Sequence, residues 1–70
     1  MSMINENTDA VFDGRNWYYD IKPGSICVDE SSNVVSFSIY WRHGSRGEIG
    51  VRRITLALDC VKGARERATV

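Results

Sequence analysis

A run of alternating apolar and polar residues occupies positions 34–42 and limits the folds open to this chain. Val35, Phe37, Ile39 and Trp41 occupy every other position of the run, and polar residues lie between them. Side chains along a strand point to opposite faces in turn, so this period of two is typical of a strand with one face in a core. We therefore predict a strand at residues 34–42.

A second alternating run follows at residues 52–60, where apolar side chains again recur at every other position: Ile54, Leu56, Leu58 and Cys60. Residues 43–48 join the two runs and contain Gly44 and Gly47, as short connections between antiparallel strands often do. We predict that the two runs pair as one long hairpin. Ile49 and Val51 have the opposite parity, so we also predict a β-bulge at Arg52 and Arg53 that restores the register.

Shorter strands are predicted on either side of this hairpin. Residues 16–22 alternate so that Trp17, Tyr19 and Ile21 share the buried face and Tyr18 lies on the polar face. Pro23 and Gly24 then turn the chain, and residues 25–29 form a strand that the polar residues 30–33 close. Residues 61–70 fit either a helix, through positions 64–68, or an edge strand, and we favour the strand.

The fold class is therefore mainly β, a small antiparallel sheet of four or five strands. A chain of 70 residues holds one domain. Apart from Val11 and Phe12, residues 1–13 are mostly small, polar or acidic and show no period, so we expect a flexible N-terminal segment followed by a single domain at residues 14–70. Cores of this size contribute little stability and often depend on a disulfide, a metal or a second subunit. A homodimer is accordingly an expectation.

The two cysteines are too few for a structural zinc site. Cys27 points away from Ile26 and Val28 on an ideal strand, whereas Cys60 shares the apolar face of Leu58. That difference weighs against a disulfide without excluding it, and the alternative is two reduced, packed thiols. We expect no cofactor and no metal.

The charge balance argues against nucleic acid and anionic membranes as partners, because nine basic residues cancel nine acidic ones. The charge is unevenly distributed: residues 1–33 hold six acids and two bases, and the remainder holds three acids and seven bases. Residues 1–10 contain no apolar stretch of the kind found in signal peptides or membrane spans. We expect a cytoplasmic protein unless a leader has been removed.

No enzymatic motif is present, and His43 is the only histidine. A nucleophilic pair of His43 with Cys27 or Cys60 is the one catalytic arrangement that the composition permits. A histidine in a glycine-rich connection is more often simply exposed, so we expect no enzyme.

A binding role has more support, because cations and aromatics gather at one end of the predicted hairpin. Tyr40 and Trp41 lie beside them, and arginine and aromatic side chains are the usual anchors of protein interfaces. Tyr18, predicted to be exposed, is a further anchor. The candidate protein-binding residues are Tyr18, Arg42, His43, Arg46, Arg52 and Arg53.

The order of short motifs along residues 17–67 resembles the bacterial surface-adhesin E-like domains. The motifs are Tyr18-Tyr19-Asp20, Ser25-Ile26, an alternating strand that ends at Trp41, and Leu58-Asp59-Cys60 before a basic tail. The resemblance implies a small antiparallel sheet in an exported bacterial protein, and founding members of the family bind host matrix proteins. The chain departs from the pattern in its short connection at residues 43–48 and in having no leader.

A second class of function is compatible with the same sequence features. Very small leaderless β-proteins of phages and mobile elements, including anti-CRISPR proteins, block a host complex by covering part of its surface. Both classes predict a non-enzymatic protein-binding module that uses the arginine-rich end of the hairpin. Neither identifies the partner.

Overall fold

The long hairpin is the largest element of the fold, formed by β4 (Val34–His43) and β5 (Glu48–Ala57). In the computed structural model, which describes residues 3–68, the two strands pair without interruption from Val34 opposite Ala57 to His43 opposite Glu48. The predicted hairpin is confirmed. Its second strand begins at Glu48, earlier than expected. It also ends earlier, at Ala57, because Leu58–Cys60 form a single-turn 3-10 helix, η1.

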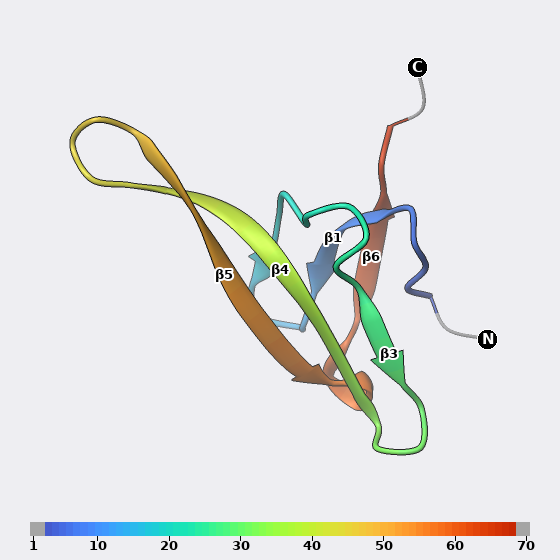
Figure 1. The fold of residues 1–70 in the computed structure, drawn as a ribbon. Helices are drawn as coiled ribbons and strands as arrows, with labels where there is room; N and C mark the ends of the chain where they lie inside the picture. Colours follow the sequence, from blue (N-terminus) through green and yellow to red (C-terminus); the bar gives the residue numbers. More distant parts are fainter. Residues whose placement is uncertain (1–2, 69–70) are drawn as a thin grey trace.

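Two antiparallel sheets of three strands each make up the domain (Figure 1). The hairpin sheet has the order β3-β4-β5, with β3 at Cys27–Asp29. The terminal sheet has the order β2-β1-β6, with β1 at Thr8–Phe12, β2 at Trp17–Tyr18 and β6 at Gly63–Glu66. The strand favoured for residues 61–70 is thus confirmed at β6, while positions 69–70 lie outside the described residues.

The prediction of a flexible segment at residues 1–13 is wrong for the described part of that segment. β1 is the central strand of the terminal sheet, and Thr8, Ala10 and Val11 have no exposed surface. The register between β1 and β6 shifts between Thr8 and Ala10. This irregularity breaks the alternation of side chains, so the strand carries no period of two in its sequence.

The predicted bulge at Arg52 and Arg53 is also wrong. The β4–β5 ladder runs through both positions in one register, so Ile49 and Val51 remain on the face opposite Ile54. They are 64% and 56% exposed. This end of the hairpin covers no core. No bulge is therefore needed to move Ile49 and Val51 to the face of Ile54, and their opposite parity is kept.

The core lies between the two sheets and draws on both. Its fully or nearly buried apolar residues are Ile4, Val11, Ile21, Val35 and Phe37. Tyr18 of the terminal sheet meets the Phe37 ring edge-on, with the centroids 6.1 Å apart. Apolar contact between the sheets supplies most of the driving force for a domain of this size.

Both thiols are free, as favoured, but both are exposed rather than packed. Cys27 pairs with Ser36 on the outer face of the hairpin sheet. Cys60 lies in η1 and not on the apolar face of a strand. Because the strand ends at Ala57, the alternation that placed Cys60 in the core does not extend to it.

The chain passes from one sheet to the other at Asp20, which has a φ of 56°. Before this residue Tyr18 pairs with Val11 in the terminal sheet, and after it Ile21 pairs with Ile39 of β4. A left-handed residue turns the strand direction, and asparagine and aspartate tolerate that conformation better than most residues. The single strand predicted at residues 16–22 is therefore two short segments with different faces inward.

Replacing Ile4 by Ala tests whether the N-terminal residues belong to the core. Ile4 is 5% exposed, so we expect a loss of about 2–4 kcal/mol in the free energy of unfolding. Its neighbour Met3 is 55% exposed, and Met3→Ala should change stability by less than about 0.5 kcal/mol. Urea denaturation measures both. Equal, small effects would contradict the placement of Ile4.

Candidate functional site

The end of the long hairpin projects from the two sheets as a two-stranded ribbon, which we call the hairpin arm and define as residues 40–51 (Figure 1). Its tip is a four-residue connection with Gly44 and Gly47 at positive φ, 75° and 71°. The N–H of Gly47 donates to the carbonyl oxygen of Gly44. These glycines allow the tight reversal that holds the two strands in register to the end.

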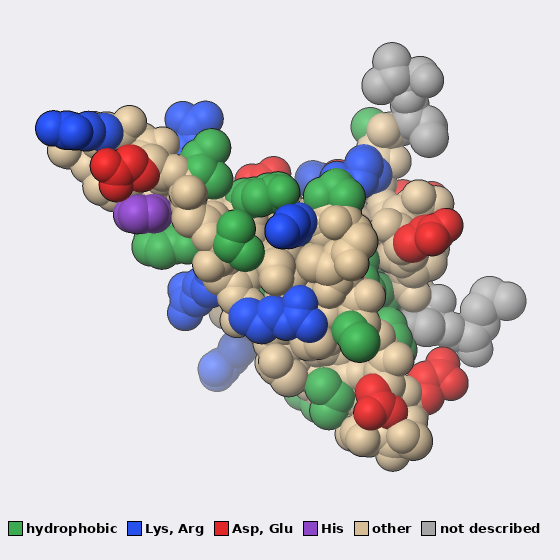
Figure 2. All heavy atoms as spheres, in the orientation of Figure 1, with side chains coloured by type: hydrophobic (Ala, Val, Ile, Leu, Met, Phe, Trp, Pro, Cys, Tyr) green, Lys and Arg blue, Asp and Glu red, His purple; other side chains and the backbone are tan. Residues whose placement is uncertain are grey.

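Four large apolar side chains of the arm remain in solvent: Tyr40 at 40%, Trp41 at 45%, Ile49 at 64% and Val51 at 56% exposure. Figure 2 shows hydrophobic side chains along the arm, between the basic tip and the body. Isolated exposed apolar residues are common on protein surfaces, whereas several on one projecting element make that element a candidate interaction site.

The ladder sorts the arm into two faces. Tyr40 lies opposite Val51, and Arg42 lies opposite Ile49, so these four side chains share the outer face. Trp41 lies opposite Gly50 on the other face, and the Trp41 and His43 rings are 4.7 Å apart. A Cβ atom at Gly50 would lie 3.1 Å from both rings. The glycine thus leaves the space that the two rings occupy.

The predicted cations divide between different places. Arg42, His43 and Arg46 lie in the arm, as expected. Arg52 and Arg53 lie at its base on opposite faces, because Arg52 pairs with Ile39 and Arg53 with Ser38. The structure therefore does not bring all five together in one basic patch.

Arg53 ties the strands of the hairpin sheet together. Its guanidinium donates to the Ser36 hydroxyl at 2.7 Å, to the Ser38 hydroxyl at 3.3 Å and to the Ser25 carbonyl oxygen at 3.1 Å. These bonds cross from β5 over β4 to the segment before β3. Arg53 thus has a role within the sheet that its sequence position did not reveal.

Tyr18 is half-buried and faces the core, so its predicted exposure is wrong. The chain crossing at Asp20 reverses the parity on which that prediction depended. Trp17 and Tyr19 are instead the exposed residues of the segment, at 42% and 49%. The Tyr18 hydroxyl donates to Asp13 Oδ2 at 3.1 Å, which raises the pKa of Tyr18, and burial raises it further.

Asp13 is held by several donors. The backbone N–H groups of Asn16 and Arg15 donate to its Oδ1, and with the Tyr18 hydroxyl they lower the pKa of the Asp13 carboxyl. Hydrogen bonds to a carboxylate favour its charged form. Tyr18 therefore closes the turn between β1 and β2 and is not a surface anchor.

His43 does not meet either cysteine. Cys27 pairs with Ser36, seven residues along β4 from His43, which is about 23 Å at about 3.3 Å per residue. Cys60 lies beyond Ala57, at the other end of the hairpin. The near neighbours of His43 are Trp41 and the Glu48 carboxylate, 4.0 Å from Nδ1. The Cys–His pair considered from sequence is not formed.

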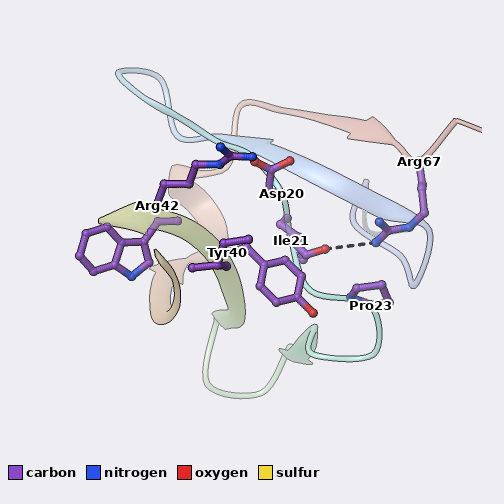
Figure 3. A pocket seen from close by; sticks show the side chains of 8 residues that line it. Asp20, Ile21, Pro23, Tyr40, Arg42 and Arg67 are labelled. Carbon is purple, nitrogen blue, oxygen red and sulfur yellow. Dashed lines mark hydrogen bonds between the residues drawn. The ribbon is translucent and has the colours of Figure 1, made fainter. Parts of the chain in front are cut away.

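A groove of about 510 Å³ lies where the arm meets the body. The arm forms one wall, the segment before β3 forms the other, and Arg67 follows from β6. In Figure 3 the Tyr40 ring and Ile21 lie in the middle, with Arg42 and Arg67 on opposite sides. The lining residues are Asp20, Ile21, Pro23, Tyr40, Trp41, Arg42, Ile49 and Arg67.

Sequence reasoning found Arg42 of this groove and missed its other charged residues, Asp20 and Arg67. The guanidinium of Arg67 donates to the Ile21 carbonyl oxygen at 3.3 Å, which joins the end of β6 to the segment before β3. No local pattern identifies such a long-range contact. Ile49 did carry a signal, since its parity is wrong for a core residue, but that signal had been assigned to a bulge.

A second exposed aromatic group covers the outer face of the terminal sheet. Trp17 stacks between Phe12 and Tyr19, with centroids 5.2 Å and 5.9 Å away, and Arg65 lies over the Tyr19 ring at 5.4 Å. Arg65 also pairs with Asp9 at 2.9 Å, and its pKa is raised chiefly by that hydrogen bond. The faces of these rings cover one another. We call this layer the reference surface, because it serves for comparison with the groove in binding experiments.

Within residues 3–68, no group of three or more His, Cys, Asp or Glu side chains is placed to hold a metal ion. No helix among the same residues is long and apolar enough to span a membrane.

The Asp13 hydrogen bonds predict a pH dependence of stability. Because the folded pKa of Asp13 is lowered, its contribution is present above the ordinary pKa of 3.8 and is lost as the pH falls through the folded value. Asp13→Asn should therefore lower stability at neutral pH and reduce the loss seen between about pH 4 and pH 2. Denaturation midpoints across this range measure the effect. Glu30→Gln is the control, and an Asp13→Asn profile parallel to that of the control would contradict the assignment.

Gly50→Ala should displace the Trp41 ring, because the added methyl would lie 3.1 Å from Trp41 Nε1 and from the His43 ring. The backbone φ of Gly50 is ordinary, so the strand itself tolerates alanine. In a Trp17→Phe background, which leaves Trp41 as the only tryptophan, we expect a shifted Trp41 emission spectrum and an unchanged far-ultraviolet circular dichroism spectrum. An unchanged emission spectrum would contradict this packing.

Comparison with known proteins adds no relative: no protein-family model matches the sequence, and no curated protein or solved structure is significantly similar to it.

Proposed function

We propose that this protein is a non-enzymatic protein-binding module and that its working surface is the groove at the base of the hairpin arm. The carrying observation is the exposure of Tyr40, Trp41 and Ile49 on a well-defined ribbon, 40% to 64% in solvent. Aromatic and arginine side chains are enriched among the residues that dominate interface energies. The groove supplies both kinds.

The chemistry of the groove favours an extended segment of a partner protein. Its middle is apolar, through Tyr40 and Pro23 above the buried Ile21, and the arginines flank it. A guanidinium has five donors, so Arg67 keeps donors available beyond its bond to Ile21. A partner segment with an apolar side chain between acidic residues would match this arrangement.

The exposed anchors have apolar surface left to bury on binding. Full burial of one large apolar side chain contributes about 1.5–3 kcal/mol. Because Tyr40, Trp41 and Ile49 are already about half buried, completing their burial contributes roughly 2–5 kcal/mol before the cost of association, and hydrogen bonds from arginine add to this. Truncating one anchor should therefore weaken binding by about tenfold or more, since about 1.4 kcal/mol corresponds to a factor of ten.

The arrangement of cations speaks against nucleic acid as the partner. Arg53 is engaged in the hairpin sheet and Arg52 lies on the other face, while Asp20 contributes negative charge to the groove. A phosphate backbone needs a continuous cationic track, and its binding weakens steeply with salt. Protein binding is also the activity that the resemblance to adhesin E-like domains implies.

A photo-crosslinking experiment tests the proposal. Benzoylphenylalanine at position 49 places the probe in the groove, and the same residue at position 19 places it on the reference surface. In lysate of the native host, position 49 should yield a discrete protein adduct that survives nuclease treatment, whereas position 19 should not. The unlabelled natural protein should compete for the adduct.

Competition by unlabelled variants measures how much each side chain contributes to binding. Trp41→Ala and Arg42→Glu should each need at least about tenfold more protein than the natural sequence to compete. Tyr19→Ala, a matched change of an exposed aromatic on the terminal sheet, should compete normally. Equal competition by all three variants, or the same adduct from position 19, would contradict the groove as the binding surface.

A further inference from the structure

The outer edge of β5 is an open hydrogen-bonding ladder. Because the sheet order is β3-β4-β5, one edge of β5 pairs with β4, and no strand among residues 3–68 lies beside the other edge. β5 is ten residues long, and a strand edge of this length is a template for pairing with another strand.

Backbone contacts show which residues present their polar groups at that edge. Ser38 and Tyr40 bond to Lys22 and Asp20, so these residues of β4 point away from β5. In an antiparallel ladder, the residues opposite them on β5 also point away from the pair. Ser38 faces Arg53 and Tyr40 faces Val51. The outward residues of β5 are therefore Ile49, Val51, Arg53 and Thr55.

The N–H and C=O groups of these four residues accept and donate no hydrogen bond within residues 3–68. Their side chains lie on the outer face of the arm and its base. The edge thus combines unpaired backbone groups with the two most exposed apolar side chains of the arm, Ile49 and Val51.

We propose that β5 pairs with β5 of a second copy, antiparallel about a two-fold axis at Val51. In this register Val51 faces Val51 of the second copy, and Ile49 faces its Arg53. Outward residues then oppose outward residues at three positions, which exchange about six hydrogen bonds. The two hairpin sheets become one continuous sheet across the axis.

The outer face supports this register. Tyr40 and Val51 are cross-strand neighbours within each copy, so the axis places four apolar side chains in one row: Tyr40 and Val51 of the first copy, then Val51 and Tyr40 of the second. Ile49 lies diagonal to Val51 of the second copy, within reach of contact. On the other face, Glu48 lies diagonal to Arg52 of the second copy, so the charges are complementary.

Registers with the axis nearer the C-terminal end of β5 are less favourable. An axis at Arg52 or at Arg53 sets two identical cations directly opposite each other, which is destabilising. An axis at Ile54 places Ile49 opposite residue 59, which lies in η1 and not in a strand. The two arginines therefore disfavour the registers in which each would face its own copy.

This inference does not depend on the proposed function. The groove is lined chiefly from the β4 side of the arm and the dimer contact uses the outer edge of β5, with Ile49 in both. An adduct of position 49 with a second copy has twice the chain mass, which distinguishes it from an adduct with a different protein. A dimer would carry two grooves. If the protein proves to be monomeric, the competition assay with Trp41→Ala still tests the groove.

Substitution of Val51 by residues of opposite charge tests the proposal, because only a residue on a two-fold axis faces the same residue of the second copy. Light scattering with size exclusion should give the natural protein twice the 7.9 kDa chain mass. Val51→Lys and Val51→Glu should each be monomeric alone, through like-charge repulsion, and should form a dimer when mixed in equal amounts. The matched controls Ser32→Lys and Ser32→Glu, in the turn before β4, should remain dimeric.

Each other result overturns the proposal. A monomeric natural protein at high concentration removes the dimer. Persistent dimers of both Val51 variants remove the edge contact, and a dimer of Val51→Glu alone indicates Val51 opposite Arg53 and removes the axis.

Amide hydrogen exchange of the natural protein keeps the test independent of how the variants fold. The N–H groups of Val51 and Arg53 should exchange at least about tenfold more slowly when the concentration is raised from the monomeric to the dimeric range. The N–H groups of Gly50 and Arg52, which bond to β4, should be insensitive to concentration. Concentration-independent exchange at Val51 would contradict edge pairing.

Discussion

The uninterrupted ladder between β4 and β5 is the constraint on which the rest of the structure depends. Ten consecutive register pairs fix the face of every side chain in β4 and β5. At the body end this places Val35 and Phe37 in the core. At the arm end the same alternation continues with no core behind it, so Trp41 reaches solvent although it shares the face of Val35 and Phe37, while Tyr40, Ile49 and Val51 lie on the outer face. The exposed surface is therefore a direct consequence of strand length.

The terminal sheet exists because the hairpin sheet cannot bury its apolar face alone. β1 and β6, which are far apart in the sequence, pair beside each other and cover Phe37 and Val35 with Val11 and Ala64. Asp20 connects the sheets, and its left-handed conformation lets Tyr18 and Ile21 both face the core from different sheets. Stability thus depends on residues near both chain ends.

The sequence predicted the parts of the fold in which one face of a strand is buried over several residues. The period of Val35, Phe37 and Ile39 identified the hairpin, and the signals of Pro23 and Gly24 identified a turn whose Gly24 has a φ of 77°. β1 escaped notice because its register shift removes the alternation. Periodicity is informative only where packing preserves it.

The site was less predictable, for two physical reasons. Neighbours in sequence lie on opposite faces of a strand, so Arg52 and Arg53 separate although their spacing suggested one cluster. Residues distant in sequence meet only through the tertiary fold, as Asp20 and Arg67 do in the groove. The parity change at Ile49 and Val51 is compatible either with a bulge or with exposure to solvent, and the sequence alone does not distinguish the two.

The two edges of the arm differ in what they can recognise. Toward the groove, β4 offers mainly side chains, since its backbone is paired with the segment before β3 up to Tyr40. Along the outer edge, β5 offers backbone groups as well, and a backbone ladder recognises any strand of suitable register. Specificity at β5 must therefore come from the side chains that flank the ladder, chiefly the arginines at positions 52 and 53.

An apolar ribbon with an open edge is an aggregation hazard when it is unpaired. A closed two-fold contact pairs the β5 edge of both copies at once. The groove, which recognises its ligand through side chains, then remains available to a different protein.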